Sequence, residues 1–404
     1  MTNTNSVDLD FSKFPFAFRQ LLKIADKIRY GRLDIILPDG NRLTFSGDEE
    51  PSSVGVIEVK NFRFARRVLI GGDIGFYESF ADGDWTTPNL ADCLYIFARN
   101  ADHIQNAFTG SPIWDLINNI RHAWNKNTKA GSRRNIMAHY DLGNNFYQEW
   151  LDQTMTYSSA LFPTPDADLS AAQIYKYENL ARSIDLSEND HVLEIGSGWG
   201  GFAEYAAKEH GARITGLTVS PAQYDYAKQR IFNAGLAEKV DFRLQDYRDS
   251  DATFDKIASI EMFEAVGKEY WNTYFEKVRN ALKPGGIAGL QIITIADRFF
   301  DHYSKSTDFI QRYVFPGGVL PSESILKNLI NESGLSLRKA NPFGQDYART
   351  LNEWHQRFLS KWDTIQTLGF DDRFKSLWQF YLAYCEAGFK AGTTNVSQFS
   401  VARV

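Results

Sequence analysis

The stretch that decides the fold is Val192-Leu-Glu194-Ile-Gly196-Ser-Gly198-Trp-Gly200-Gly201. It predicts a short apolar strand that runs into a glycine-rich turn and then into a helix. Glycines at such a turn permit positive φ angles and let a ligand approach the backbone closely. Open α/β sheets bind ligands at the carboxyl ends of their strands, where this turn would lie. The stretch therefore predicts a ligand site at one edge of an α/β sheet.

Helices alternate with strands on both sides of this stretch. We expect helices at 176–184, 200–210, 221–234 and 270–282, and strands at 191–195, 213–217, 240–244, 256–260 and 289–295. Strands that are separated by helices imply parallel pairing through right-handed crossovers. The predicted fold class is therefore α/β, with a doubly wound, Rossmann-like sheet.

Three features indicate which ligand the glycine turn binds. Glu194 stands two residues before the first glycine, where its carboxylate can face the cationic amino group of a methionine moiety. The loop 218–223 (TVSPAQ) lacks the acidic ribose ligand that a dinucleotide site requires. Asp246 and Tyr247 follow a later strand, where an acid and an aromatic ring can hold adenine. These features favour S-adenosylmethionine (SAM) over a dinucleotide; a glycine turn without a ligand is the structural alternative.

The 404 residues predict more than one domain. We expect a small α+β domain at 1–120, which contains a hairpin because Asp39-Gly40 separates two alternating runs. A polar linker is predicted at 121–135, and the second domain at 136–404.

The composition excludes several classes of protein. The net charge of −6 argues against a nucleic-acid binder. Cys93 and Cys385 lie far apart and predict neither a disulfide framework nor a zinc site, which suits a reducing cytoplasm. Neither a secretory signal nor an apolar run of about 18–20 residues is present in the sequence. The basic segment 121–134 predicts either a solvated linker or a peripheral contact with the inner face of the membrane.

Seven segments along the chain carry a family resemblance. They are His139–Asn144, Met155–Ser158, Leu193–Gly201, Gly216–Ser220, Gln245–Asp249, Ser259–Gly267 and Phe315–Pro321. In this order they resemble the cyclopropane-fatty-acid synthases and the related mycolic-acid methyltransferases, over most of residues 135–395. The resemblance implies a class I SAM methyltransferase domain with an acyl-chain pocket. It also implies transfer of the SAM methyl carbon to the double bond of an unsaturated phospholipid acyl chain at the membrane surface. A carbocation would follow, and a bound bicarbonate would remove its proton.

The resemblance also implies roles for particular residues. Glu264 matches the carboxylate that holds the bicarbonate, and Tyr347 matches its tyrosine partner. The residues that match the SAM contacts are Tyr157, Ser158, Glu194, Gly196, Ser197, Gly198, Gly200, Gly201, Thr218, Ser220, Gln223, Asp246, Tyr247 and Ile260.

Three positions depart from the ring-forming members. Ser159 replaces a cysteine, and Gln291 replaces a histidine, so that an amide stands where an imidazole could take up a proton. Glu261 adds a carboxylate three residues before Glu264. If both carboxylates face the pocket, their repulsion would raise one pKa and supply a protein base. Two outcomes stay open: closure of a cyclopropane, or proton loss that leaves a methylene branch or a shifted double bond.

Cys385 matches a cysteine that some descriptions of the family place in the active site. It lies in a helical apolar stripe with Leu377, Trp378, Tyr381 and Leu382, which favours a buried structural thiol.

The N-terminal domain is the least defined part of the resemblance. Its segment 71–85 is similar to a region of the bacterial members that implies membrane contact or a homodimer, with a spacer or lid as the alternative. Two other functions compete with the leading hypothesis. One is a SAM methyltransferase that acts on another small apolar acceptor, and the other is a lipid-binding protein with an inactive methyltransferase domain.

Overall fold

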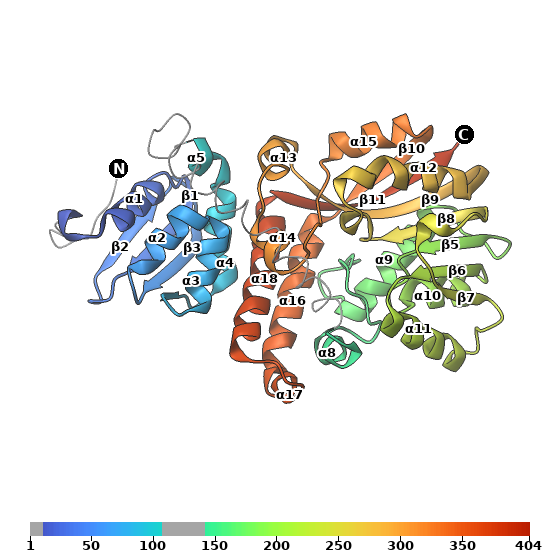
Figure 1. Cartoon of the computed structure of the whole chain (residues 1–404), viewed down its shortest axis with the longest axis horizontal. Helices are drawn as coiled ribbons and strands as arrows, with labels where there is room; N and C mark the ends of the chain where they lie inside the picture. Colours follow the sequence, from blue (N-terminus) through green and yellow to red (C-terminus); the bar gives the residue numbers. More distant parts are fainter. Residues whose placement is uncertain (1–10, 107–141) are drawn as a thin grey trace. The chain divides into compact units, whose positions relative to one another are not determined.

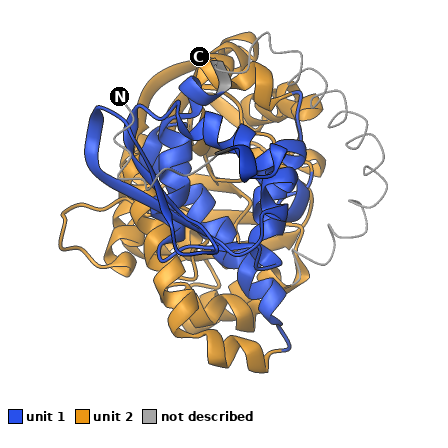
Figure 2. Cartoon of the chain, turned by 90° about the vertical axis from the view of Figure 1, so that its left-hand side faces the viewer, with its two compact units in different colours: residues 1–137, 305–316, 369–393 blue, residues 138–304, 317–368, 394–404 orange. Residues whose placement is uncertain are grey.

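The computed structural model describes residues 11–106 and 142–404, which form two compact units (Figure 2). Among the described residues, unit 1 contains 11–106, 305–316 and 369–393. Unit 2 contains 142–304, 317–368 and 394–404. Each unit is described by itself below.

Unit 2 is built on a seven-stranded sheet (Figure 1). One strand, β11, runs antiparallel to both of its neighbours, and the other pairs in the sheet are parallel. This arrangement confirms the predicted doubly wound fold. The strands in sheet order are β10 (Leu335–Pro342), β11 (Thr394–Arg403), β9 (Leu282–Ile295), β8 (Phe254–Ile260), β5 (His191–Ile195), β6 (Arg213–Thr218) and β7 (Val240–Leu244).

Helices cover both faces of this sheet (Figure 1). On one face lie α9 (Leu169–Ser183), α10 (Gly201–Glu209) and α11 (Pro221–Asn233), and on the other α12 (Trp271–Ala281) and α15 (Glu323–Glu332). Val192 of β5 belongs to the hydrophobic core on the α9 side of the sheet, and Leu193 belongs to the core on the α12 side. Both residues are almost fully buried. A strand buried on both faces needs consecutive apolar residues, which explains the apolar run in this strand.

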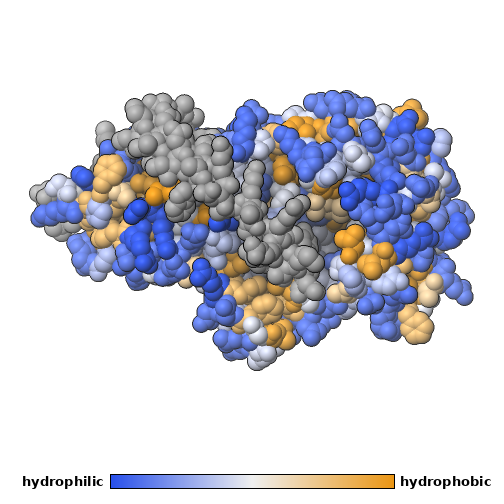
Figure 3. All heavy atoms as spheres, in the orientation of Figure 1, coloured by the Kyte–Doolittle hydropathy of each residue, from blue (hydrophilic) through white to orange (hydrophobic). Residues whose placement is uncertain are grey.

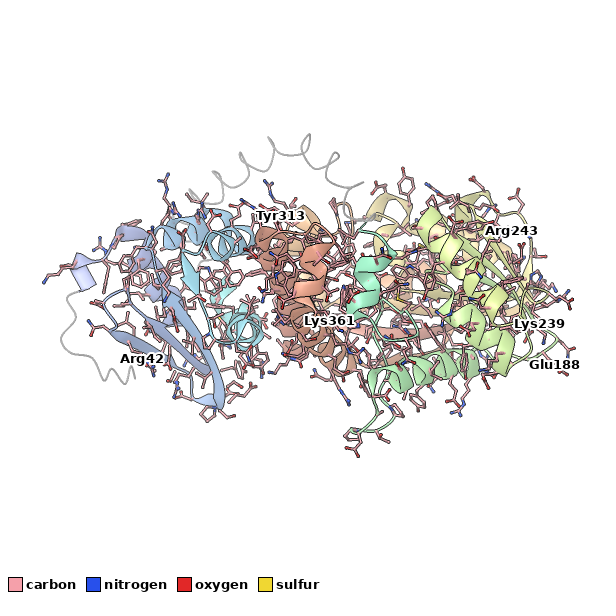
Figure 4. All side chains as sticks on the ribbon, turned by 90° about the horizontal axis from the view of Figure 1, so that it is seen from below. Arg42, Glu188, Lys239, Arg243, Tyr313 and Lys361 are labelled. Atoms are coloured by element: carbon pink, nitrogen blue, oxygen red, sulfur yellow. The ribbon has the colours of Figure 1, made fainter. Side chains whose placement is uncertain are left out.

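Seven further helical elements complete the part of unit 2 that the structure describes. They are α8 (Asn144–Trp150), η2 (Tyr247–Asp249), η3 (Phe263–Ala265), η4 (Lys268–Tyr270), α13 (Asp297–Tyr303), α16 (Gly344–Ser360) and α17 (Trp362–Thr367). At the β7 edge of the sheet, the side chains of Lys239 and Arg243 point outward (Figure 4). Charged side chains at an exposed edge discourage pairing with a second chain.

Unit 1 has a smaller sheet in the order β2-β1-β3-β4. The predicted hairpin is confirmed, because β1 and β2 pair antiparallel and the amide of Gly40 donates to the carbonyl of Leu37 in the turn. The elements are η1 (Phe11–Lys13), α1 (Phe16–Ala25), β1 (Tyr30–Ile36), β2 (Arg42–Ser46), β3 (Glu49–Val59), α2 (Arg63–Gly71), α3 (Asp73–Ala81), β4 (Trp85–Thr86), α4 (Leu90–Arg99), α5 (Ala101–Asn106), α14 (Phe309–Tyr313) and α18 (Asp372–Ala391).

Helices α14 and α18 correct the predicted domain boundary, since they belong to unit 1 and not to a continuous domain at 136–404. Phe380 of α18 is fully buried, and its ring packs against Phe76, Phe80 and Phe309. The hydroxyl of Tyr384 on α18 donates to Asp73 of α3 at 3.2 Å. An amphipathic pattern shows that a helix buries one face, but not which partner covers that face. The predicted linker at 121–135 lies outside the described residues.

The surface of the described residues is mostly polar. The face visible in Figure 3 is largely hydrophilic, with smaller hydrophobic areas. Large exposed apolar side chains include Phe16, Val219 and Phe232. Within 11–106 and 142–404, no helix is both long enough and apolar enough to cross a bilayer. Membrane contact and a homodimer stay predictions.

The assignment of α18 to unit 1 can be tested with Phe380→Ala. The cavity left among the neighbouring rings should cost about 3–5 kcal/mol of folding free energy. Hydrogen exchange should lose protection in Asp73–Ala81 and keep it in Gly201–Glu209. Arg373→Ala, an exposed change on the same helix, should alter stability by less than about 0.5 kcal/mol. Equal effects of the two changes would contradict the assignment.

Candidate functional site

The glycine turn after β5 has the predicted conformation. Gly196, Gly198 and Gly200 have φ angles of 82°, 50° and 81°. The amide of Gly196 donates to the carbonyl of Leu217 at 3.0 Å, which ties the turn to the end of β6. A Cβ atom on Gly196 would lie 2.8 Å from Cγ of Met262, whereas one on Gly198 would meet nothing within 4 Å. The turn therefore requires glycine at 196 and leaves open space beside 198.

Glu194 has a carboxylate oxygen available for a ligand. The residue is 3% exposed, and its Oε2 atom is buried without a hydrogen-bond partner. Burial raises the pKa of Glu194 well above its usual value, against the opposing charges of Arg230 and Lys176. An unpaired buried carboxylate oxygen is costly, and a cationic partner would remove that cost. The residues present therefore fit the ammonium group of SAM.

Other predicted SAM contacts gather at the carboxyl ends of adjacent strands. Thr218 ends β6, Ile260 ends β8, and Asp246 follows β7 by two residues. Thr218 Oγ1 donates to Gln223 Oε1 at 3.0 Å, and the Ser220 side chain caps α11. These contacts hold the loop between β6 and α11 in place.

Asp246 and Tyr247, which follow β7, contact different neighbours. Asp246 accepts hydrogen bonds from the side chain of Arg248, and these bonds lower its pKa. The ring of Tyr247 lies 5.6 Å from that of Tyr274. Adenine would therefore meet an ionised Asp246 that already pairs with an arginine.

The segments before α9 support the same turn. Asn144 accepts a 2.7 Å hydrogen bond from the indole of Trp199 and donates to the carbonyl of Ala222. The ring of Tyr157 packs against Trp150 and Trp354. His139 and Tyr140, which the resemblance places over the cofactor and which could instead cap or pack the first helix of the second domain, lie outside the described residues.

A second cluster surrounds Glu261. Its Oε1 atom accepts hydrogen bonds from the amide of Ser159 at 2.8 Å and from Nε2 of Gln291 at 2.7 Å. Its Oε2 atom accepts a bond from the hydroxyl of Tyr347 at 2.7 Å. Glu261 has a φ angle of 49°, a left-handed conformation that costs a non-glycine residue about 1–3 kcal/mol. The structure thus brings together four of the predicted catalytic residues around one carboxylate.

The predicted pairing of Glu264 with Tyr347 is not observed, because the hydroxyl of Tyr347 donates to Glu261 instead. The Oε1 atom of Glu264 accepts a short hydrogen bond from the amide of Ile293, and its Oε2 atom is buried without a partner. Burial and, secondarily, the charge of Glu261 raise the pKa of Glu264 to about 8. Burial also raises the pKa of Glu261, so both carboxyl pKa values are raised and burial contributes more than the expected repulsion. Glu264 is mostly protonated at neutral pH.

Two buried residues near this cluster escaped the sequence analysis. Lys176 on α9 is 0% exposed, and its Nζ donates to Ser158 Oγ at 2.8 Å. Burial lowers its pKa to about 7, against the attraction of nearby carboxylates. Gln398 on β11 donates to Gln291 Oε1 at 3.1 Å. The helical spacing of Lys176 from buried Ala172 and Leu180 was the available signal.

Cys385 lies on α18 in unit 1, whereas the carboxylate cluster belongs to unit 2. Burial and the charge of Asp308 raise the pKa of the Cys385 thiol. A neutral thiol is a poor nucleophile, because the thiolate is the reactive form. The structure therefore favours the structural interpretation of this cysteine.

The acyl-chain pocket stays a prediction. Unit 2 has a hollow of about 470 Å³ whose lining is polar and includes Arg182, Arg338, Lys339 and Gln398. Such a lining does not suit a hydrocarbon chain.

Comparisons with known proteins agree with this geometry. A family model described as mycolic acid cyclopropane synthetase matches residues 127–399. Tuberculostearic acid methyltransferase UfaA1 from Mycobacterium tuberculosis is 36% identical over 92% of this chain and 88% of its own. Cyclopropane-fatty-acyl-phospholipid synthase from Escherichia coli K12 is 35% identical over 83% of this chain and 84% of its own.

Solved structures give the same result. The cyclopropane synthase MmaA2 from Mycobacterium tuberculosis superposes with a TM-score of 0.63 and 27% identity, over 67% of this chain and 97% of its own. The mycolic acid cyclopropane synthase CmaA1 superposes with a TM-score of 0.62 and 27% identity over the same shares, and it was crystallised with SAH and CTAB. SAH is the product that SAM leaves after methyl transfer. These neighbours show a fold that binds SAM, and the turn after β5 stays the predicted SAM site.

Gly196→Val tests the turn. The added side chain would collide with Met262 at a φ angle that valine disfavours, so SAM affinity in calorimetry should fall below detection. Gly235→Val is the matched control, because Gly235 also has a positive φ but its Cβ would meet nothing within 4 Å. It should lose about 1–2 kcal/mol of stability and retain SAM binding. Normal binding by the Gly196 variant would exclude this turn as the SAM site.

Proposed function

The chain belongs to the family of mycolic acid cyclopropane synthetases, lipid-modifying methyltransferases that use SAM, and we propose that it methylates the double bond of an unsaturated phospholipid acyl chain. The E. coli relative is named for a fatty-acyl-phospholipid. The CmaA1 structure contains CTAB, a lipid-like detergent. Both observations support an acyl chain as the methyl acceptor.

SAM supplies an electrophilic methyl group when it is bound. The π electrons of the alkene would form the new C–C bond while the S–CH₃ bond of SAM breaks and its electron pair stays on sulfur, so that SAH leaves and the other alkene carbon becomes a carbocation. Aromatic faces stabilise nearby cations. The ring of Trp354 lies 5.3 Å from that of Tyr157 and 6.1 Å from that of Tyr347, so an aromatic wall stands beside Glu261. The reaction then requires a base to take one proton from the cation.

Glu261 is the base in this proposal, and this assignment carries the mechanism. The resemblance matches Tyr347 to a residue beside a bicarbonate, and it places Ser159 and Gln291 where ring-forming members have a cysteine and a histidine. In this chain the three residues donate instead to the carboxylate of Glu261. A bicarbonate would have to displace that carboxylate from its donors, so it does not fit the cluster as folded. The second carboxyl, Glu264, is mostly protonated at neutral pH and accepts protons poorly.

The product in this proposal is a methyl-branched or methylene-branched chain. A carboxylate that is fixed by three donors and a strained backbone cannot follow the cation, and removes only the proton at which it points. Proton loss from the chain carbon on the other side of the cation gives a shifted double bond beside the methyl branch, and proton loss from the carbon that carries the new methyl group gives a methyl-branched double bond. A methylene branch forms when a hydride first moves from the methyl-bearing carbon to the cation and the methyl group then loses the proton. Relatives named for methyl transfer, UfaA1 and a probable fatty acid methyltransferase of Pseudomonas putida at 37% identity, support this outcome.

Product analysis tests this outcome. The enzyme is incubated with SAM that carries a labelled methyl group and with vesicles of unsaturated phospholipid. Mass spectrometry of the released acyl chains should detect a chain heavier by one carbon that still contains a double bond and reacts on hydrogenation. A cyclopropane chain as the sole product would overturn the proposed product but not the proposed substrate.

Glu261→Gln tests the base. The amide keeps the shape of the side chain but cannot accept the proton, so turnover should fall by about 10²–10⁴-fold. SAM affinity should change little. Glu264→Gln is the matched control three residues away. Because Glu264 is already mostly neutral at pH 7, this variant should lose much less activity. Equal losses of turnover in both variants would contradict the assignment of Glu261 as the base.

Glu261→Gly tests the role of bicarbonate. Glycine suits the φ angle of 49° and frees the donors of Ser159, Gln291 and Tyr347. Added bicarbonate should restore part of the activity of this variant, while removal of bicarbonate should leave the rate of the wild-type enzyme unchanged. A wild-type enzyme that stops without bicarbonate would contradict the assignment of Glu261.

A further inference from the structure

Lys176 is a buried ammonium group with no part in the reaction described so far. It lies on α9 with 0% exposure, and its Nζ atom donates a hydrogen bond to the hydroxyl of Ser158 at 2.8 Å. The ring of Tyr177 lies 4.8 Å from Nζ. Burial of a cation is expensive unless nearby charges compensate for it.

Carboxylates provide that compensation. The charge of Lys176 is attracted most strongly by Glu261, and then by Asp152 and Glu194. Asp152 is occupied, since it accepts bonds from the amide and the hydroxyl of Thr154. Glu194 belongs to the SAM site. The base is thus the carboxylate to which this cation is most strongly coupled.

The main chain and Gln398 connect the same two residues. Lys176 holds the side chain of Ser158, and the next residue, Ser159, donates its amide to Glu261. The Nε2 atom of Gln398 donates both to the carbonyl of Lys176 and to Oε1 of Gln291, each at 3.1 Å. Gln291 then donates to Glu261 at 2.7 Å. Two routes of direct contacts therefore lead from Lys176 to the donors of the base.

We propose that Lys176 is a positioning residue that keeps the carboxylate of Glu261 ionised and aligned, and so sets the lower limit of the pH range in which the enzyme works. The proposal rests on the function proposed above. Burial opposes a negative charge on Glu261. The donors Tyr347, Gln291 and Ser159 stabilise that charge, and Lys176 supplies the nearby positive charge.

The direction of the effect follows from these charges. Burial raises the pKa of Glu261, and the hydrogen bonds of Tyr347 and Gln291 and the charge of Lys176 oppose that rise. Removal of the positive charge should therefore raise the pKa further. More Glu261 would be protonated near neutrality, and a protonated carboxyl cannot take the proton from the cation. Activity should be lost first at the acidic end of the pH range.

Lys176→Met is the test, because methionine fills a similar volume without a charge. The rate of methyl transfer to unsaturated phospholipid vesicles is measured between pH 6 and pH 9. The acidic limb should move up by about 1 pH unit, which is a tenfold loss at low pH, with little change on the alkaline plateau. Lys176→Arg should return the limb towards its original position. Lys208→Met, an exposed change on α10, should leave the profile unchanged.

A uniform loss of activity at every pH, with an unmoved limb, would show a merely structural role and overturn the proposal. If Lys176→Met does not fold, Ser158→Ala is tested instead, because this change removes the hydroxyl that accepts the hydrogen bond of the Lys176 ammonium group. The acidic limb of Ser158→Ala should move in the same direction by a smaller amount. An unmoved limb would overturn the proposal.

Infrared titration separates this proposal from the proposed function. The carbonyl band of a protonated Glu261, identified by its absence from Glu261→Gln, should appear at higher pH in Lys176→Met than in the wild-type chain. This readout needs no substrate. If phospholipid is not methylated, the proposed function fails while the infrared shift still tests Lys176. An unshifted band would overturn the role of Lys176 alone.

Discussion

The site depends on the three hydrogen bonds to the carboxylate of Glu261. The donors are 102, 30 and 86 residues away along the chain, so one side chain joins segments that have no local reason to meet. Hydrogen bonds to an ionised acceptor are stronger than neutral ones, and the left-handed backbone at Glu261 is strained enough to need them. The Ser159 loop, β9 and α16 are thereby fixed around one reactive oxygen pair.

The sheet explains how these donors converge. Ile260 at the end of β8 pairs with Gln291 of β9, so Glu261 lies one residue beyond that pair. The amide of Glu261 also donates to the carbonyl of Gln291 at 2.8 Å. Glu261 is therefore aligned by the same strand pairing that builds the core. The glycine turn follows β5, the neighbour of β8, so this turn and Glu261 share one edge of one sheet.

Local patterns were enough for the parts of the fold that depend on nearby residues. The alternation of helices and strands, the turn at Gly196 and the hairpin at Gly40 each reflect backbone requirements that act over a few positions. Contacts between distant segments were harder to predict. The stripe on α18 showed a buried face but not its partners in unit 1. Tyr347 was matched to Glu264, because a one-dimensional match does not show which of two nearby carboxylates a hydroxyl reaches. Lys176 was not identified from the sequence, because burial of a cation depends on carboxylates that lie elsewhere in the sequence.

The position of β11 has a consequence for biosynthesis. This strand is the last of the seven in chain order, yet it lies between β9 and β10 and also carries Gln398. Until it has left the ribosome, β10 has no neighbour in the sheet and Gln291 lacks one of its partners. The ordered form of the reaction centre is thus among the final events of folding, and a nascent chain that stalls before this strand would carry an open sheet for chaperones to shield.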